Sequence, residues 1–183
     1  MCIKKILILA ALFVTIFFTS SASASKLALS DMEFAAFTAE LQKNLIDKSL
    51  QINDLKRTPE DDIKPDAKNK IQTYSWKASL FSKESSAEVA DVNFATDSDN
   101  KITFIALSIK EGVNQETICN TFWDSAFTAL NFTADERKQF LTGGTINKDG
   151  FYGSKLQRSK KENFVFMTGI LPNKVLFSTF GKI

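Results

Sequence analysis

The sequence predicts one α+β domain with an N-terminal helix, an antiparallel β-meander, a central helical pair and a second antiparallel β-meander. Apolar residues recur at helical spacing in two parts of the chain. In several short segments they instead alternate with polar residues, and turn-forming residues separate these segments. The strands are therefore grouped on either side of a helical pair, which is typical of an α+β domain.

The first helix is predicted over residues 31–54. Ser30 and Glu33 have the spacing of a capping box, in which two side chains satisfy free amides at a helix start. The apolar residues at helical spacing are Phe34, Phe37, Leu41, Leu45 and Ile52. Residues 56–70 are charged and contain two prolines, so we expect a solvated loop there.

Three strands are predicted next, over residues 71–81, 87–95 and 101–110. The first two alternate apolar and polar residues, as half-buried strands do. The third is apolar on both faces, so we expect it near the centre of a sheet. The intervening TDSDNK has the composition of a hairpin turn. The pattern leaves open whether the two meanders share one sheet.

The central helical pair begins with a helix capped by Asn114 and running through Leu130. On a helical wheel Cys119 falls near the middle of its apolar arc, one turn from Trp123. We therefore expect Cys119 to be buried and free, because unpaired cysteine packs as a small hydrophobe. An intermolecular disulfide is the alternative.

A second capping box, Thr133 to Glu136, opens a short helix that Gly143 and Gly144 end. We expect glycine there in the left-handed conformation. Strands are then predicted over residues 151–158, 162–170 and 174–180, with turns at 147–150, 159–161 and 172–173.

The N-terminus has the three parts of a secretory signal peptide. Lys4 and Lys5 precede an uncharged apolar run over residues 6–18, and small residues follow it. We predict cleavage between Ala24 and Ser25, with Ala22 as the second choice. A membrane anchor is the alternative, but a spanning helix needs roughly 20 apolar residues. The prediction is thus a signal peptide over residues 1–24 and a soluble domain over 25–183.

Composition limits the compartment and the partners. The only charges in residues 1–24 are two lysines, so the net charge of +2 falls to zero in the mature chain. A neutral balance does not favour nucleic acid or an anionic membrane as partner. Cysteine occurs only at positions 2 and 119. Because cleavage removes the first, a bacterial periplasmic or secreted protein fits better than a disulfide-rich eukaryotic domain.

The usual catalytic and metal-binding signatures are missing. There is no histidine, which excludes histidine-based catalysis and histidine-ligated zinc. No nucleotide-binding fingerprint occurs. We expect no cofactor and no metal, and we predict that the protein is not an enzyme. A pair of carboxylates could still act as a hydrolase, since it needs only two acids close in space.

The later strands have more apolar faces than a one-sided sheet requires, especially around residues 164–167 and 175–180. A second layer, a ligand cavity or a surface for a partner would each account for them.

The leading hypothesis is an exported, non-catalytic protein that binds another protein, such as an inhibitor or immunity factor for a toxin or hydrolase. Its expected contact surfaces are the strand edges and the loop 56–70. The second hypothesis is a carrier or sensor of a small apolar ligand, with a pocket lined by Phe122, Trp123, Phe164 and Phe166. A carboxylate-pair hydrolase is third.

Overall fold

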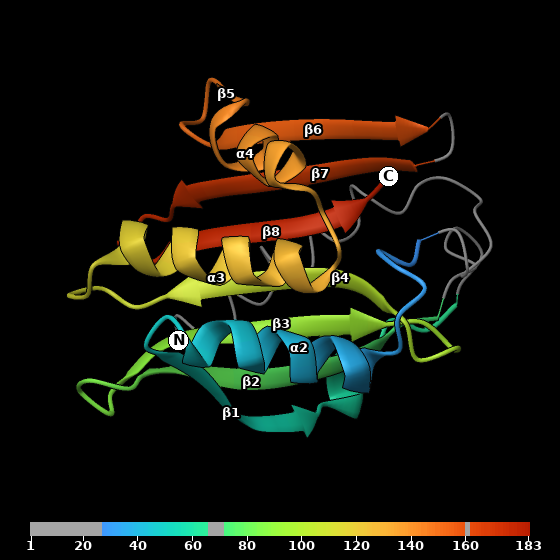
Figure 1. Ribbon diagram of the computed structural model, residues 1–183, viewed down its shortest axis with the longest axis horizontal. Helices are drawn as coiled ribbons and strands as arrows, with labels where there is room; N and C mark the ends of the chain where they lie inside the picture. Colours follow the sequence, from blue (N-terminus) through green and yellow to red (C-terminus); the bar gives the residue numbers. More distant parts are fainter. Residues whose placement is uncertain (1–26, 66–71, 160–161) are drawn as a thin grey trace.

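The fold is α+β with an N-terminal helix, a meander, a central helical pair and a second meander, as the sequence predicts, and each meander has one strand more than predicted (Figure 1). A computed structural model describes residues 27–65, 72–159 and 162–183 of the chain. The helices are α2 (Phe34–Ile46), α3 (Gln115–Ala129) and α4 (Ala134–Thr142), with a short 3-10 helix η2 (Pro59–Asp61). The strands are β1 (Leu50–Arg57), β2 (Tyr74–Ser82), β3 (Glu88–Thr96), β4 (Ile102–Ile109), β5 (Thr145–Ile146), β6 (Tyr152–Ser159), β7 (Glu162–Ile170) and β8 (Leu176–Lys182).

The two meanders form a single antiparallel sheet. Its strand order in the described residues is β1-β2-β3-β4-β8-β7-β6-β5. The halves join where β4 pairs with β8, with Ile105 opposite Phe180. This central place for β4 confirms the prediction made from its two apolar faces.

The topology repeats itself across the centre of the sheet. Each half is a helical segment followed by four strands, and each half places its strands in sequence order from the outer edge to the centre. Antiparallel pairing of the last strands, β4 and β8, relates the halves by an approximate two-fold axis through the sheet. Residue patterns alone reveal no such repeat.

The three helices lie on one face of the sheet and enclose the main core (Figure 1). One row of helix-facing side chains crosses six strands in register: Trp76, Phe94, Ile105, Phe180, Phe166 and Ser154. The ring of Phe180 lies 4.9 Å from that of Phe127 on α3 and 5.2 Å from that of Phe140 on α4, between ring centroids. Each such buried ring contributes about 1.5–3 kcal/mol, so this aromatic packing fixes both later helices to the sheet.

The first helix is shorter than predicted, because residues 50–57 form strand β1 instead. Ser49 has φ 63°, a left-handed conformation that interrupts the helical path after α2. Ile52 then pairs with Leu80 of β2. Its spacing of seven residues from Leu45 also fits a helix, so periodicity could not separate the two readings.

The predicted capping box at the start of α2 does not form. Glu33 occupies the N-cap position without a side-chain cap. The Ser30 hydroxyl accepts a hydrogen bond from the Met32 amide at 3.2 Å. The Phe34 amide donates to the Asn100 carbonyl at 2.8 Å. A backbone carbonyl of the 97–101 hairpin thus satisfies the first free amide of α2.

The caps of the other two helices are as predicted. The Asn114 side chain accepts from the Thr117 amide at 3.2 Å at the start of α3. At the start of α4 the Thr133 amide donates to Glu136 Oε2 at 2.8 Å, and the Glu136 amide donates to the Thr133 hydroxyl at 3.3 Å. This reciprocal pair is a complete capping box.

Glycine ends α4 for a different reason from the one predicted. Gly143 has φ −93°, so it does not adopt the left-handed conformation. A Cβ at Gly143 would lie 2.8 Å from the Gln139 carbonyl oxygen, and a Cβ at Gly144 would lie 2.3 Å from that of Gly153. Close backbone approach therefore requires these glycines, rather than a positive φ.

The predicted loop 56–70 is only partly a loop. Residues 56 and 57 belong to β1, η2 follows, and Ile63 forms a β-bridge with Thr73. The hairpin turn before β4 is confirmed, since Asp97 Oδ1 accepts from the amides of Asp99 and Lys101. The predicted signal peptide and cleavage site, residues 66–71 and most of the turn 159–161 lie outside the described residues.

Candidate binding surface

The four aromatic residues expected to line a ligand pocket belong to the main core. Phe122, Trp123, Phe164 and Phe166 are at most 1% exposed. The Trp123 ring centroid lies 5.3 Å from that of Phe122 and 5.1 Å from that of Phe166. These rings fill the space between α3 and the sheet by packing against one another.

Cys119 is buried, 5% exposed, and forms no disulfide within the described residues. Its Sγ lies 3.9 Å from the Ser178 hydroxyl, which accepts a 2.6 Å hydrogen bond from Trp123 Nε1. Burial raises the pKa of the Cys119 thiol to about 11, although the hydrogen bond with Ser178 opposes the shift. The thiol therefore stays protonated at neutral pH and acts as a packing group.

The sheet has a second face, opposite α2, α3 and α4, which we call the far face. Strand register assigns side chains to it, because neighbours directly opposite in a ladder point the same way. Over β2 and β3 the far face is polar, with Ser75, Lys77, Ser79, Asp91 and Asn93. From Ala95, near the end of β3, it becomes apolar across β4, β8 and β7, with Phe104, Ala106, Phe177, Val165 and Met167 around Thr179.

The apolar half of the far face forms its own cluster, separate from the main core. Its buried members are Phe104, Ala106, Leu171 and Phe177, with Ala95 and Phe151 packed against them. In the full-length chain Phe104 is 9% exposed and Phe177 8%. The surplus apolar character of β7 and β8 is thus directed to the face away from the helices.

Two glycines let aromatic rings lie flat on the far face. A Cβ at Gly181 would lie 3.3 Å from the ring of Phe104, its partner across the ladder. A Cβ at Gly169 would lie 2.4 Å from the ring of Phe151. Aromatic side chains that cover strand glycines fix register and keep the sheet packed where side chains are missing.

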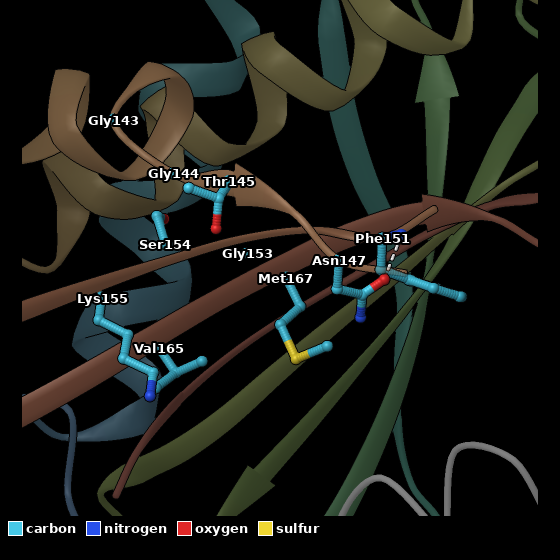
Figure 2. A pocket seen from close by; sticks show the side chains of 10 residues that line it. All are labelled: Gly143, Gly144, Thr145, Asn147, Phe151, Gly153, Ser154, Lys155, Val165 and Met167. Atoms are coloured by element: carbon cyan, nitrogen blue, oxygen red, sulfur yellow. Dashed lines mark hydrogen bonds between the residues drawn. The ribbon is translucent and has the colours of Figure 1, made fainter. Parts of the chain in front are cut away.

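An open pocket of about 380 Å³ lies beside this cluster, at the corner of the sheet formed by β5, β6 and β7 (Figure 2). Its residues are Gly143, Gly144, Thr145, Asn147, Phe151, Gly153, Ser154, Lys155, Val165 and Met167. Figure 2 shows the Lys155, Val165 and Met167 side chains standing on the same side of the sheet. The pocket has an apolar floor and one cationic side chain at its rim.

The structure brings one pair of acids together that could bear on the carboxylate hypothesis. Glu88 and Asp91 lie close on β3, and burial, followed by the charge of Glu88, raises the pKa of Asp91. Glu88 also forms a 2.9 Å ion pair with Lys110. Within the described residues no group of three or more acidic or thiol ligands could hold a metal ion.

The described part of the charged loop is tied to the sheet by its own charges. Both terminal nitrogens of Arg57 donate to Asp62 at 2.6 Å. The guanidinium hydrogen bond holds the pKa of Asp62 below its usual range, against the effect of burial. Asp61 pairs with Lys77 at 2.6 Å. These charges stabilise the turn after β1, which weakens the case for the loop as a contact surface.

Sequence reasoning missed the far face as a surface. The signal was present, because Gly153, Gly169 and Gly181 interrupt strands that are otherwise apolar or alternating. Glycine inside a strand often marks close approach of another group. Without the strand order, nothing showed that these positions lie on one face.

Comparison with known protein families, curated proteins and solved structures finds no match for this chain. Among the described helices, none is both long enough and apolar enough to cross a membrane.

Proposed function

We propose that this chain is an exported, non-catalytic protein that binds another protein through the far face of its sheet. An inhibitor or immunity factor for a toxin or hydrolase is the class that we favour. Export rests on the signal-peptide pattern of residues 1–24. The observation that supports the binding surface is the division of the far face into an apolar half and a polar half.

The dimensions of the far face suit a protein partner. The six strands from β2 to β6 in the sheet order, spaced about 4.8 Å apart and each of about eight residues rising about 3.3 Å per residue, give a face of roughly 750 Å². A standard protein interface buries about 800 Å² on each partner. Interfaces of this size usually combine apolar and polar side chains, as the two halves of the far face do.

The packing of the main core favours this proposal over the carrier. A carrier needs space between sheet and helices, where the tilted rings of Trp123 and Phe127 instead pack at 5.4 Å between ring centroids. The pocket beside β6 lies outside that layer, with Val165 and Met167 of the far face in its lining. We therefore assign recognition to the far face, where Asp91 is exposed and Phe104, Ala106, Val165 and Phe177 are at most 9% exposed.

Site-specific photocrosslinking tests the proposal directly. A benzoylphenylalanine at Asn93, in the polar half of the far face, is compared with one at Asn120, exposed on α3. The protein is produced in its source cells and irradiated there. We expect a crosslinked product of one defined mass from position 93 only, because only that side chain would lie in the interface.

A product from position 120 alone, or none from position 93, would contradict the use of the far face. Mass spectrometry of the product identifies the partner. If the crosslinked molecule is a lipid or another small apolar compound, the carrier hypothesis replaces the protein-binding one.

A further inference from the structure

We propose that glutamine side chains from two helices close both edges of the sheet to strand addition, and that Gln42 keeps strand β1 from pairing with a second copy of this chain. Gln42 belongs to α2 and acts at the β1 edge, while Gln139 belongs to α4 and acts at the β6 edge. This inference does not depend on the proposed function, since it concerns the edges of the sheet and not its far face.

The outer edge of β1 contains one short regular stretch, residues 50–53, in which each residue lies directly opposite a residue of β2. Leu50 is buried and Ile52 packs against the main core, so the stretch has apolar side chains on its inner side. No further strand of the described residues pairs with its outer side. Unpaired backbone groups of a strand are a template for pairing with another chain.

Gln42 occupies the middle of this stretch. The Ile52 amide donates a 2.7 Å hydrogen bond to Gln42 Oε1. Because backbone groups of successive residues in a strand point to opposite sides, the Ile52 amide faces the open edge, while the amides of Gln51 and Asn53 face β2. An incoming strand would have to displace the Gln42 side chain before it could pair with this part of β1.

Beyond Asn53 the backbone of β1 is irregular, and this irregularity closes the rest of the edge. The register with β2 shifts between Asn53 and Lys56, and Asp54 has φ 57°, the left-handed conformation. Asp54 and Lys56 are exposed and charged. Bulges and charged side chains are both means by which natural sheets prevent edge pairing. The hydrogen bond from Ile52 to Gln42 therefore protects the part of β1 that the bulge leaves flat.

The opposite edge has a similar arrangement, with α2 and α4 on either side of α3 (Figure 1). Strand β5 pairs only with Tyr152 and Gly153, so the rest of β6 has no strand of the described residues on its outer side. There the Lys155 carbonyl accepts a 2.9 Å hydrogen bond from Gln139 Nε2. Each half of the sheet thus directs a helix glutamine to its own edge, which argues against the strand edges as contact surfaces for a partner.

Hydrogen exchange and sedimentation of Gln42→Leu test the inference, with the protein in the form that its source cells produce. Leucine is of similar size and helix propensity but has no acceptor, so it frees the Ile52 amide. At low concentration we expect that amide to exchange about two- to tenfold faster than in the wild type, as the loss of one hydrogen bond implies. At high concentration we expect a dimer, with an association constant at least about tenfold above that of the wild type. In the dimer the Ile52 amide should be protected again.

Three further variants are measured in parallel. Gln42→Ala removes the acceptor without adding apolar surface and should give the same results as Gln42→Leu. Gln42→Glu retains an oxygen acceptor and should behave as the wild type does. Gln51→Leu adds an apolar side chain to the same edge strand, where the half-buried Gln51 has no recorded side-chain hydrogen bond among the described residues. It should leave both the Ile52 exchange rate and the monomer unchanged.

Unchanged exchange at Ile52 in the folded Gln42→Leu and Gln42→Ala variants would overturn the role of Gln42. Variants that exchange faster but stay monomeric at high concentration would overturn the claim that this side chain prevents pairing. Equal dimerisation of Gln51→Leu and Gln42→Leu, or a dimer in which the Ile52 amide stays unprotected, would also contradict the proposal, because the copies would then associate through an apolar surface.

Discussion

Glu136 and Arg158 join the start of α4 to the end of β6. Arg158 Nε and Nη2 donate to the two carboxylate oxygens of Glu136 at 2.6 and 2.7 Å. The guanidinium also lies 4.1 Å from the ring centroid of Phe132. The hydrogen bond from Arg158 is the main reason why the pKa of Glu136 is lowered from 4.5 to about 2. This contact is a charge-assisted link between the start of α4 and the second meander.

Glu136→Gln is predicted to lower the free energy of unfolding by about 1.5–3 kcal/mol near neutral pH, the range for hydrogen bonds to charged groups. The folded pKa lies below the unfolded one, so the stabilisation is present above pH 4.5 and is lost as the pH falls toward 2. Urea unfolding at about pH 7 and about pH 3 measures both effects, and the gap between wild type and variant should shrink at the lower pH.

Glu84→Gln is the matched control, because Glu84 is exposed and forms no recorded ion pair among the described residues. Its effect should stay within about 0.5 kcal/mol at both pH values. Equal effects of the two substitutions, or a gap for Glu136→Gln that does not change with pH, would show that the Arg158 contact does not stabilise the fold.

The Cys119 thiol is predicted to be unreactive in the native protein. With a pKa of about 11, it is deprotonated far less at pH 8 than an ordinary thiol. Its alkylation by iodoacetamide should be at least about a hundredfold slower in buffer than in denaturing urea. Similar rates in the two solvents, or a covalent dimer on a non-reducing gel, would contradict the buried packing role.

At the scale of the element, the two predicted capping boxes differ: the one at Thr133 forms and the one at Ser30 does not. Substitutions at these two residues therefore make a matched pair. Thr133→Ala removes a hydroxyl that caps α4 and should cost about 0.5–2 kcal/mol. Ser30→Ala removes a hydroxyl that does not cap α2 and should cost less than about 0.5 kcal/mol. Thermal unfolding of both variants measures the contrast. A larger loss from the Ser30 substitution would mean that the predicted capping box forms after all.

Elements with local signals could be predicted from the sequence, and those defined by pairing could not. The caps at Asn114 and Thr133 depend on residues three apart, so the pattern located α3 and α4. The end of α2 depends on the left-handed Ser49 and on the ladder between β1 and β2. Neither feature can be recognised from the periodicity of hydrophobic residues. Strand β5 has two residues, which are too few to produce an alternating pattern.

At the scale of the whole molecule, the sequence indicated surplus apolar faces but not their location. Alternation identified Ala78 and Val92 as one side of their strands, and they do face the helices. The other side became a surface only when β4 paired with β8 and brought Phe104 and Phe177 to the centre of one face. Long-range pairing of this kind leaves no periodic trace in the chain.

The measurement that tests the central claim most directly is the affinity of the crosslinked partner for two charge variants. Ser108→Arg places a cation on the far face between Asp91 and Phe177, while Asn120→Arg places one on exposed α3. We predict that Ser108→Arg weakens binding by roughly thirtyfold or more, the loss that about 2 kcal/mol at an interface centre implies, and that Asn120→Arg changes it less than about twofold. Unchanged affinity in a folded Ser108→Arg variant, or a greater loss from Asn120→Arg, would contradict recognition through the far face.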